Sequence, residues 1–140
     1  MARIETRDIT ESIANALQYI SYYHSPDFVK AMTRAYEREE SPAAKNAMAQ
    51  ILINSRLAAE GHRPICQDTG VVVVFLKIGQ SAVIDGDDSI QDAIDNGVRR
   101  AYTNADNPLR ASMVSPPIGA RKNTGDNTPA IVHTELVPGE

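Results

Sequence analysis

The hydrophobic pattern of this chain changes its period at Cys66. Before this residue, apolar side chains recur at the spacing that places them on one face of a helix. After it, residues 71–78 form a short, continuous and largely β-branched run, which is typical of a buried strand. The chain therefore has to combine a helical first part with a sheet in its second part, which is an α+β organisation.

Residues 1–62 are predicted to form a helical group, in which each helix begins at a side chain that can accept hydrogen bonds from free backbone N–H groups. The expected capping residues are Asp8, Ser25 and Ser41. A proline follows the second and the third of these caps, at the first helical position, where its missing N–H is tolerated. Gly61 is the expected stop of the last helix, because glycine readily adopts the left-handed conformation of a helix end.

Residues 63–140 are predicted to be a mixed α/β region built on a small sheet. The expected strands are residues 71–78, 82–84 and 130–137. A helix capped by Ser89 or Asp87 is expected between the last two of them. Residues 107–128 are punctuated by proline and glycine, and a loop of this length in a compact domain is usually functional or disordered.

The composition narrows the classes of function. With 140 residues and a net charge of −4, the chain lacks the basic excess that nucleic-acid binding usually requires. Its longest apolar run is far shorter than the roughly 18 residues that suggest a membrane span. A single cysteine excludes an intramolecular disulfide and favours a reducing compartment. We therefore expect a cytoplasmic protein that binds neither nucleic acid nor a membrane.

Cys66 lies among polar residues just before the apolar run, and the sequence pattern leaves three roles open for it. A free cysteine is often a buried structural residue. A nucleophilic cysteine would need a base, and only His62 is close in sequence. A metal-ligating cysteine would need partners, yet the chain has no CxxC and no histidine pair at ligand spacing. In the same way, Asp68 can be a turn cap and Arg110 a solvated surface charge.

Several motifs of the chain occur together in one known family. They are PICQDTG at residues 64–70, NPLRAS at 107–112, IGARKNTGDNTPA at 118–130 and the helical stretch ALQYIS at 16–21. With these motifs in order, the chain resembles the class I, iron–sulfur-dependent fumarate hydratases and the related L-tartrate dehydratases. The resemblance spans essentially all of the chain.

The resemblance implies a role for four residues. The family holds a [4Fe–4S] cluster with three cysteines, and Cys66 matches the first of these ligands, so the other two ligands are expected outside this chain. Gln67 and Arg110 match positions that hold the carboxylates of the substrate. Asp68 matches a catalytic position, as proton donor or orienting carboxylate near the leaving hydroxyl, and it also contributes to substrate binding. The roles of residues 121–127 and of the three histidines stay open.

The function implied by the resemblance is the interconversion of fumarate and L-malate. The chain is expected to be the N-terminal part of the catalytic domain, truncated and inactive by itself. It would act on a C4 dicarboxylate, as a homodimer, together with the remainder of the catalytic chain or a second subunit. The alternatives are an L-tartrate dehydratase, which converts tartrate to oxaloacetate, and a non-enzymatic dimerisation or binding module.

Overall fold

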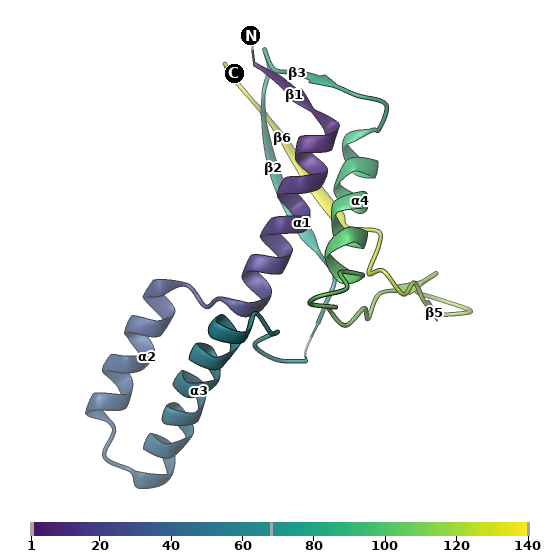
Figure 1. The fold of residues 1–140 in the computed structure, drawn as a ribbon. Helices are drawn as coiled ribbons and strands as arrows, with labels where there is room; N and C mark the ends of the chain where they lie inside the picture. Colours follow the sequence, from purple (N-terminus) through teal and green to yellow (C-terminus); the bar gives the residue numbers. More distant parts are fainter. Residues whose placement is uncertain (1, 68, 140) are drawn as a thin grey trace. The chain divides into compact units, whose positions relative to one another are not determined.

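The computed structural model describes residues 2–67 and 69–139. In chain order, the elements are β1 (Arg3–Glu5), α1 (Thr6–Tyr22), α2 (Pro26–Arg38), α3 (Pro42–Gly61), β2 (Val73–Gly79), β3 (Val83–Asp85), α4 (Ile90–Tyr102), β4 (Val114–Ser115), β5 (Lys122–Asn123) and β6 (Ile131–Val137) (Figure 1). The predicted α+β class is confirmed. Within the described residues, no helix is long and apolar enough to cross a membrane.

The chain divides into two compact units, an α/β unit of Met1–Leu17 with Asp68–Glu140 and a helical unit of Gln18–Gln67. In the α/β unit, β2 and β6 pair in parallel, with Val73 opposite Ile131. The prediction of a small sheet that contains both segments, with one helix between them in the chain, is therefore confirmed, and their direct pairing is a finding of the structure. The short strand β3 does not join them: it pairs in parallel with β1, and β4 pairs antiparallel with β5.

Helices α1 and α4 supply the apolar side chains that cover one face of the β2–β6 pair. Ile94 and Val98 of α4 are fully buried at the centre of this core. The core also contains Val72, Ala130 and partly buried Ile9, Ile13, Leu17, Val74, Leu76, Ile90, Tyr102 and Val132. Hydrophobic contact of this kind is the main favourable contribution to folding.

The prediction that residues 71–78 form a buried strand is wrong for one face of β2, because the outer face of the β2–β6 pair is exposed. Side chains alternate along β2 between the helix-covered face and the outer face, where Phe75 is 79% exposed. On β6, Val132 packs against the core, whereas Leu136 is exposed. The physical reason is that the core extends over only the first part of this strand.

The helix starts agree with the predicted caps in two of three cases. Ser25 and Ser41 are the N-caps of α2 and α3, and Ser41 Oγ accepts a hydrogen bond from the backbone N–H of Ala44. The first helix, in contrast, begins at Thr6 directly after β1, so Asp8 lies in its first turn rather than at its cap. In the first turn, the negative charge of Asp8 still interacts favourably with the positive N-terminal end of the helix dipole. Ser89, rather than Asp87, caps α4.

Helix α3 ends at the predicted residue, but a different residue takes the left-handed conformation. Gly61 is its last helical residue, and the left-handed position is taken by His62, with φ of 46°. The imidazole of His62 stacks on the ring of Tyr22, with ring centroids 4.7 Å apart. The next residue, Arg63, donates its backbone N–H to the carbonyl of Ala58. A side-chain contact therefore accompanies a backbone conformation that the sequence pattern assigned to glycine.

The closest approach of α1 and α4 occurs at Gly97. Thr10 Oγ1 of α1 donates a hydrogen bond to the carbonyl of Ala93 of α4, at 2.9 Å. A Cβ atom on Gly97 would lie 2.7 Å from Ile13 Cβ and 2.7 Å from the Thr10 carbonyl oxygen. The core therefore depends on a residue without a side chain at this position.

We predict that Gly97→Ala lowers the free energy of unfolding by about 1–3 kcal/mol, because the added methyl group overpacks a tight helix contact. Chemical denaturation followed by circular dichroism measures this change. Gly61→Ala is the matched control, since its Cβ would meet only Arg63 Cγ at 3.5 Å. Equal stability of Gly97→Ala and the parent chain would contradict the assigned contact.

Candidate functional site

The backbone before Cys66 is fixed by two hydrogen bonds in the helical unit. The N–H of Ile65 donates to the carbonyl of Ser21, at 2.8 Å. The carbonyl of Ile65 accepts from Nδ2 of Asn54, also at 2.8 Å. Cys66 and Gln67, the next two residues, have exposed side chains. The loop therefore presents a thiol and an amide outward from a held backbone, so Cys66 is not a buried structural cysteine within this unit.

An aromatic cluster supports the start of the same loop. Tyr19, Tyr22 and Tyr23, at the end of α1, form tilted or edge-on pairs with one another. His62, at the end of α3, stacks on Tyr22 and lies edge-on to Tyr23. These ring contacts join two helix ends and thereby position the chain that leads to Cys66.

The motif continues into the α/β unit after Asp68, which lies outside the described residues. Thr69 Oγ1 lies 3.3 Å from the hydroxyl of Tyr102, at the end of α4. The carbonyl of Gly70 accepts a hydrogen bond from Nδ2 of Asn127, at 2.9 Å. The residues that follow Asp68 are therefore attached to α4 and to the loop before β6.

Asn127 is the residue that sequence reasoning missed. Its side chain is fully buried, with an exposed fraction of 0%. Besides its bond to Gly70, its Oδ1 accepts from the backbone N–H groups of Ser112, at 2.9 Å, and Met113, at 3.0 Å. Its φ of 62° is left-handed, a region in which asparagine is enriched among non-glycine residues. The Gly125-Asp126-Asn127 string was the signal of such a turn, but not of these partners.

Asp126 attaches the same loop to α4. Its Oδ2 accepts from Nε of Arg99 at 2.9 Å, and its Oδ1 accepts from the N–H of Thr128 at 3.1 Å and from Oγ1 of Thr128 at 2.8 Å. Partial burial alone raises the pKa of Asp126, but the Thr128 hydrogen bonds and then Arg99 outweigh it. The net result is a pKa below its ordinary value of 3.8, so the carboxylate is charged at neutral pH.

Arg110 lies in the α/β unit, on the segment between α4 and β4, and its side chain is exposed. It is two residues before Ser112, whose N–H is held by Asn127. Cys66 and Gln67 belong to the helical unit, so different parts of the fold carry the sequence-predicted site residues.

The donor groups of the described residues include no ready-made metal centre. In residues 2–67 and 69–139, no three His, Cys, Asp or Glu side chains come together as a metal site. Each histidine instead contacts an aromatic ring: His24 stacks on Phe28, His62 on Tyr22 and His133 on Phe75. The exposed thiol of Cys66 is thus not part of a complete ligand set within these residues.

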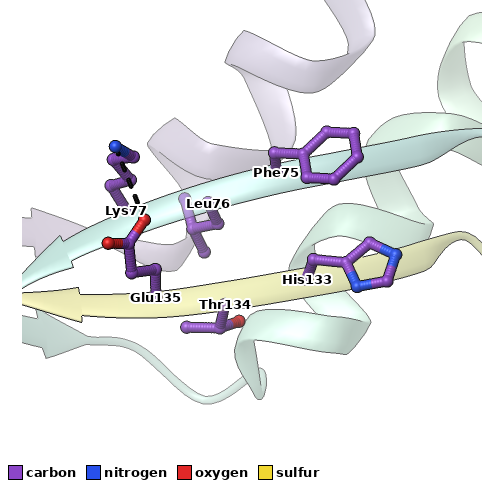
Figure 2. A pocket seen from close by; sticks show the side chains of 6 residues that line it. All are labelled: Phe75, Leu76, Lys77, His133, Thr134 and Glu135. Carbon is purple, nitrogen blue, oxygen red and sulfur yellow. Dashed lines mark ion pairs between the residues drawn. The ribbon is translucent and has the colours of Figure 1, made fainter.

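The β2–β6 pair of the α/β unit carries a hollow. It is lined by Phe75, Leu76, Lys77, His133, Thr134 and Glu135 (Figure 2). The Phe75 and His133 rings are stacked, with centroids 5.1 Å apart, and Lys77 Nζ lies 3.4 Å from Glu135 Oε2. Cys66, Gln67 and Arg110, the predicted site residues that the structure describes, do not line this hollow.

We predict that the stability difference between the parent chain and Asp126→Asn shrinks as the pH falls. A carboxyl group with a lowered pKa in the folded state stabilises the fold above its unfolded pKa, about 3.9, and this contribution is lost as the pH falls through the folded value. Thermal unfolding between about pH 7 and pH 3 measures the difference.

Asp106→Asn, at an exposed position on a nearby loop, is the control and should follow the parent chain across this range. A difference between the parent chain and Asp126→Asn that stays constant down to the lowest pH would contradict the charged Asp126–Arg99 contact.

Comparison with known proteins identifies relatives along most of the chain. The family described as fumarate hydratase (Fumerase) matches residues 10–140. A putative L(+)-tartrate dehydratase subunit alpha of Methanocaldococcus jannaschii is 34% identical over 125 residues, which are 88% of this chain and 43% of that protein. The L(+)-tartrate dehydratase subunit alpha of Escherichia coli K12 is 30% identical over 132 residues, which are 93% of this chain and 42% of that protein.

The chain thus spans less than half the length of these relatives. The matched residues include Cys66, Gln67, Arg110 and Asn127. A family match over nearly the whole chain is more specific than any one of its motifs. The chain belongs to the family of the class I fumarate hydratases and L-tartrate dehydratases.

Proposed function

We propose that this chain is one part of a hydro-lyase that interconverts fumarate and L-malate. The observation that carries the proposal is the fumarate hydratase family match across residues 10–140, which contains the whole PICQDTG motif. Because the chain spans 43% of its matched M. jannaschii relative, the activity is proposed for the complete enzyme and not for these 140 residues. Residues 1–140 would then be one part of the catalytic domain.

Cys66 is proposed as one of three cysteine ligands of a [4Fe–4S] cluster. Its exposed thiol on a held backbone is suited to one bond to iron, but the described residues offer no second thiol. The family pattern of three cysteines therefore needs two ligands from outside this chain. When bound, a cluster with one open iron supplies a Lewis acid for the departing hydroxyl group.

The remaining motif residues are proposed to handle the substrate. A C4 dicarboxylate carries two negative charges, and a guanidinium fork is suited to holding both oxygens of one carboxylate. Arg110 is proposed for this contact, and the amide of Gln67 for another carboxylate contact. Asp68 is proposed to hold or pass the proton near the leaving hydroxyl, which is ordinary work for a carboxyl group.

L-tartrate is the second candidate substrate, and the names of two matched relatives favour it. Both are called tartrate dehydratase subunit alpha. Those names also favour a separate partner subunit that supplies the rest of the catalytic unit. The cytoplasmic location and the homodimer expected from the sequence stay predictions.

Turnover by the complete enzyme under anaerobic conditions tests the proposal. The substrates are fumarate, L-malate and L-tartrate, and the products are quantified by chromatography. Conversion of fumarate to malate at a higher kcat/KM than conversion of tartrate supports the first candidate, and the reverse order supports the second. An enzyme that contains iron but converts none of the three would refute the hydro-lyase and favour a non-enzymatic binding module.

We predict that Cys66→Ser in the complete enzyme loses most of its iron and its activity together, because a hydroxyl of high pKa replaces a thiolate poorly on iron. Iron content per folded protein, with Cys66→Ala as the baseline without a donor, measures the loss. Iron content at the parent level in Cys66→Ser would remove this residue from the cluster.

We predict that Arg110→Ala in the complete enzyme weakens dicarboxylate binding and leaves the iron content unchanged. The loss of one charge-assisted hydrogen bond costs roughly 1.5–3 kcal/mol, which is about a tenfold to hundredfold rise in KM. Arg100→Ala, at an exposed arginine in the last turn of α4, is the control. Equal KM values in the two variants would make Arg110 a surface charge.

A further inference from the structure

The buried side chain of Asn127 joins two segments that carry proposed substrate-binding residues. We propose that Asn127 is a positioning residue, which fixes the position of the segment after Asp68 relative to the segment after Arg110. This inference rests on the proposed function. Gly70, its hydrogen-bond acceptor, is two residues after Asp68, and Ser112, one of its donors, is two residues after Arg110.

The carboxamide group suits this position because it donates and accepts at once. Its Nδ2 donates to the Gly70 carbonyl at 2.9 Å, while its Oδ1 accepts from the N–H groups of Ser112 at 2.9 Å and Met113 at 3.0 Å. All three bonds form at a side chain with 0% exposure. Removal of the group would leave partly buried backbone groups without this partner, which the fold would have to relieve by moving one of the two segments.

The backbone around Asn127 is itself attached to α4. Asp126 binds Nε of Arg99 at 2.9 Å, and the N–H of Ala130 donates to Oδ1 of Asp95 at 2.7 Å. Both α4 residues lie on a helix whose apolar side is fully buried at Ile94. Asn127 is thus fixed relative to the core, and it can set the position of two loops at once.

The relative position of the two segments matters at such a site, because a shift of about 1 Å in a binding group can lower the rate on the order of 10²-fold. Met113 is followed at once by β4, which pairs with β5 and so returns the chain toward Asn127. The segment before β4 is therefore held by the hairpin, by Nδ2 of Asn123, which donates to the Ala111 carbonyl at 2.9 Å, and by the carboxamide of Asn127, which also binds Gly70. We expect the distance between the two segments to respond to that carboxamide more than to the hairpin.

Two variants separate the parts of the role. Asn127→Asp keeps an acceptor for Ser112 and Met113 and tolerates the left-handed φ, but it replaces the donor to Gly70 with an oxygen. Asn127→Gly also tolerates the φ and removes the bridge without adding charge. An effect shared by both variants therefore cannot arise from repulsion between a new carboxylate and an anionic substrate.

Two controls match these variants. Asn104→Asp makes the same chemical change in a turn where Oδ1 accepts from the N–H groups of Asp106 and Asn107. Val98→Ala opens a cavity in the fully buried core and lowers stability, while the Asn127 carboxamide and the three backbone groups that it binds are unchanged. Together they distinguish a positional effect from a change of charge and from a general loss of stability.

In the complete enzyme, we expect both Asn127 variants to raise KM for the dicarboxylate about 10- to 100-fold with iron content unchanged. Both controls should keep the parent KM. Hydrogen exchange of the Ser112 and Met113 amides should stay slow in Asn127→Asp and become fast in Asn127→Gly, which reports the bridge independently of activity.

Two outcomes overturn the inference separately from the proposed function. If the parent enzyme turns over its substrate and the Asn127 variants keep its KM, or if Val98→Ala raises KM equally, Asn127 has only a structural role. If the parent enzyme turns over none of fumarate, L-malate and L-tartrate, the proposed function fails and the substrate role of Asn127 is refuted with it. In that case the exchange data still report whether the bridge exists.

Discussion

The packing of α4 against α1 and the β2–β6 pair is the contact on which the rest of the α/β unit depends. Ile94 and Val98 fill the core from one side of this helix. From the same two turns, Asp95 and Arg99 bind the backbone or side chains of residues 126–130. One helix therefore holds both the hydrophobic core and the loop that organises the motif segments.

Much of this fold could be predicted from local sequence signals. Ser41 and Ser89 start helices with a side-chain oxygen that accepts a backbone hydrogen bond. Ser25 makes no such bond, but like Ser41 it precedes a proline at the first helical position. The strands β2 and β6 could each be predicted from an apolar run on either side of a helix, whereas their direct pairing could not. The start of α1 could not be read in this way, because Thr6 begins the helix directly after a strand whose partner, β3, is distant in the chain.

The candidate site could be predicted only in part, and mainly by resemblance to a family. The pattern around Cys66 leaves its chemistry open, because one thiol without partners at ligand spacing fits several roles. Asn127 was out of reach for a different reason: its hydrogen bonds join it to Gly70, 57 residues away, and to backbone groups that have no sequence signature. Local periodicity describes helices and strands well, but it contains no information on which loop will meet another.

The parallel register between β2 and β6 also has a consequence for the order of events during synthesis. Val73 can pair only after Ile131 has been synthesised. At a synthesis rate of roughly 5–20 residues per second, several seconds separate the two residues. During that interval α4 can form and cover the inner face of β2, but the backbone groups at the edge of β2 have no partner strand. The helices α2 and α3, in contrast, contact each other across a short connection and can pair as soon as both exist. The nascent α/β unit is therefore the part of this chain with the longest period of unpaired backbone, and the one for which protection by a chaperone would matter most.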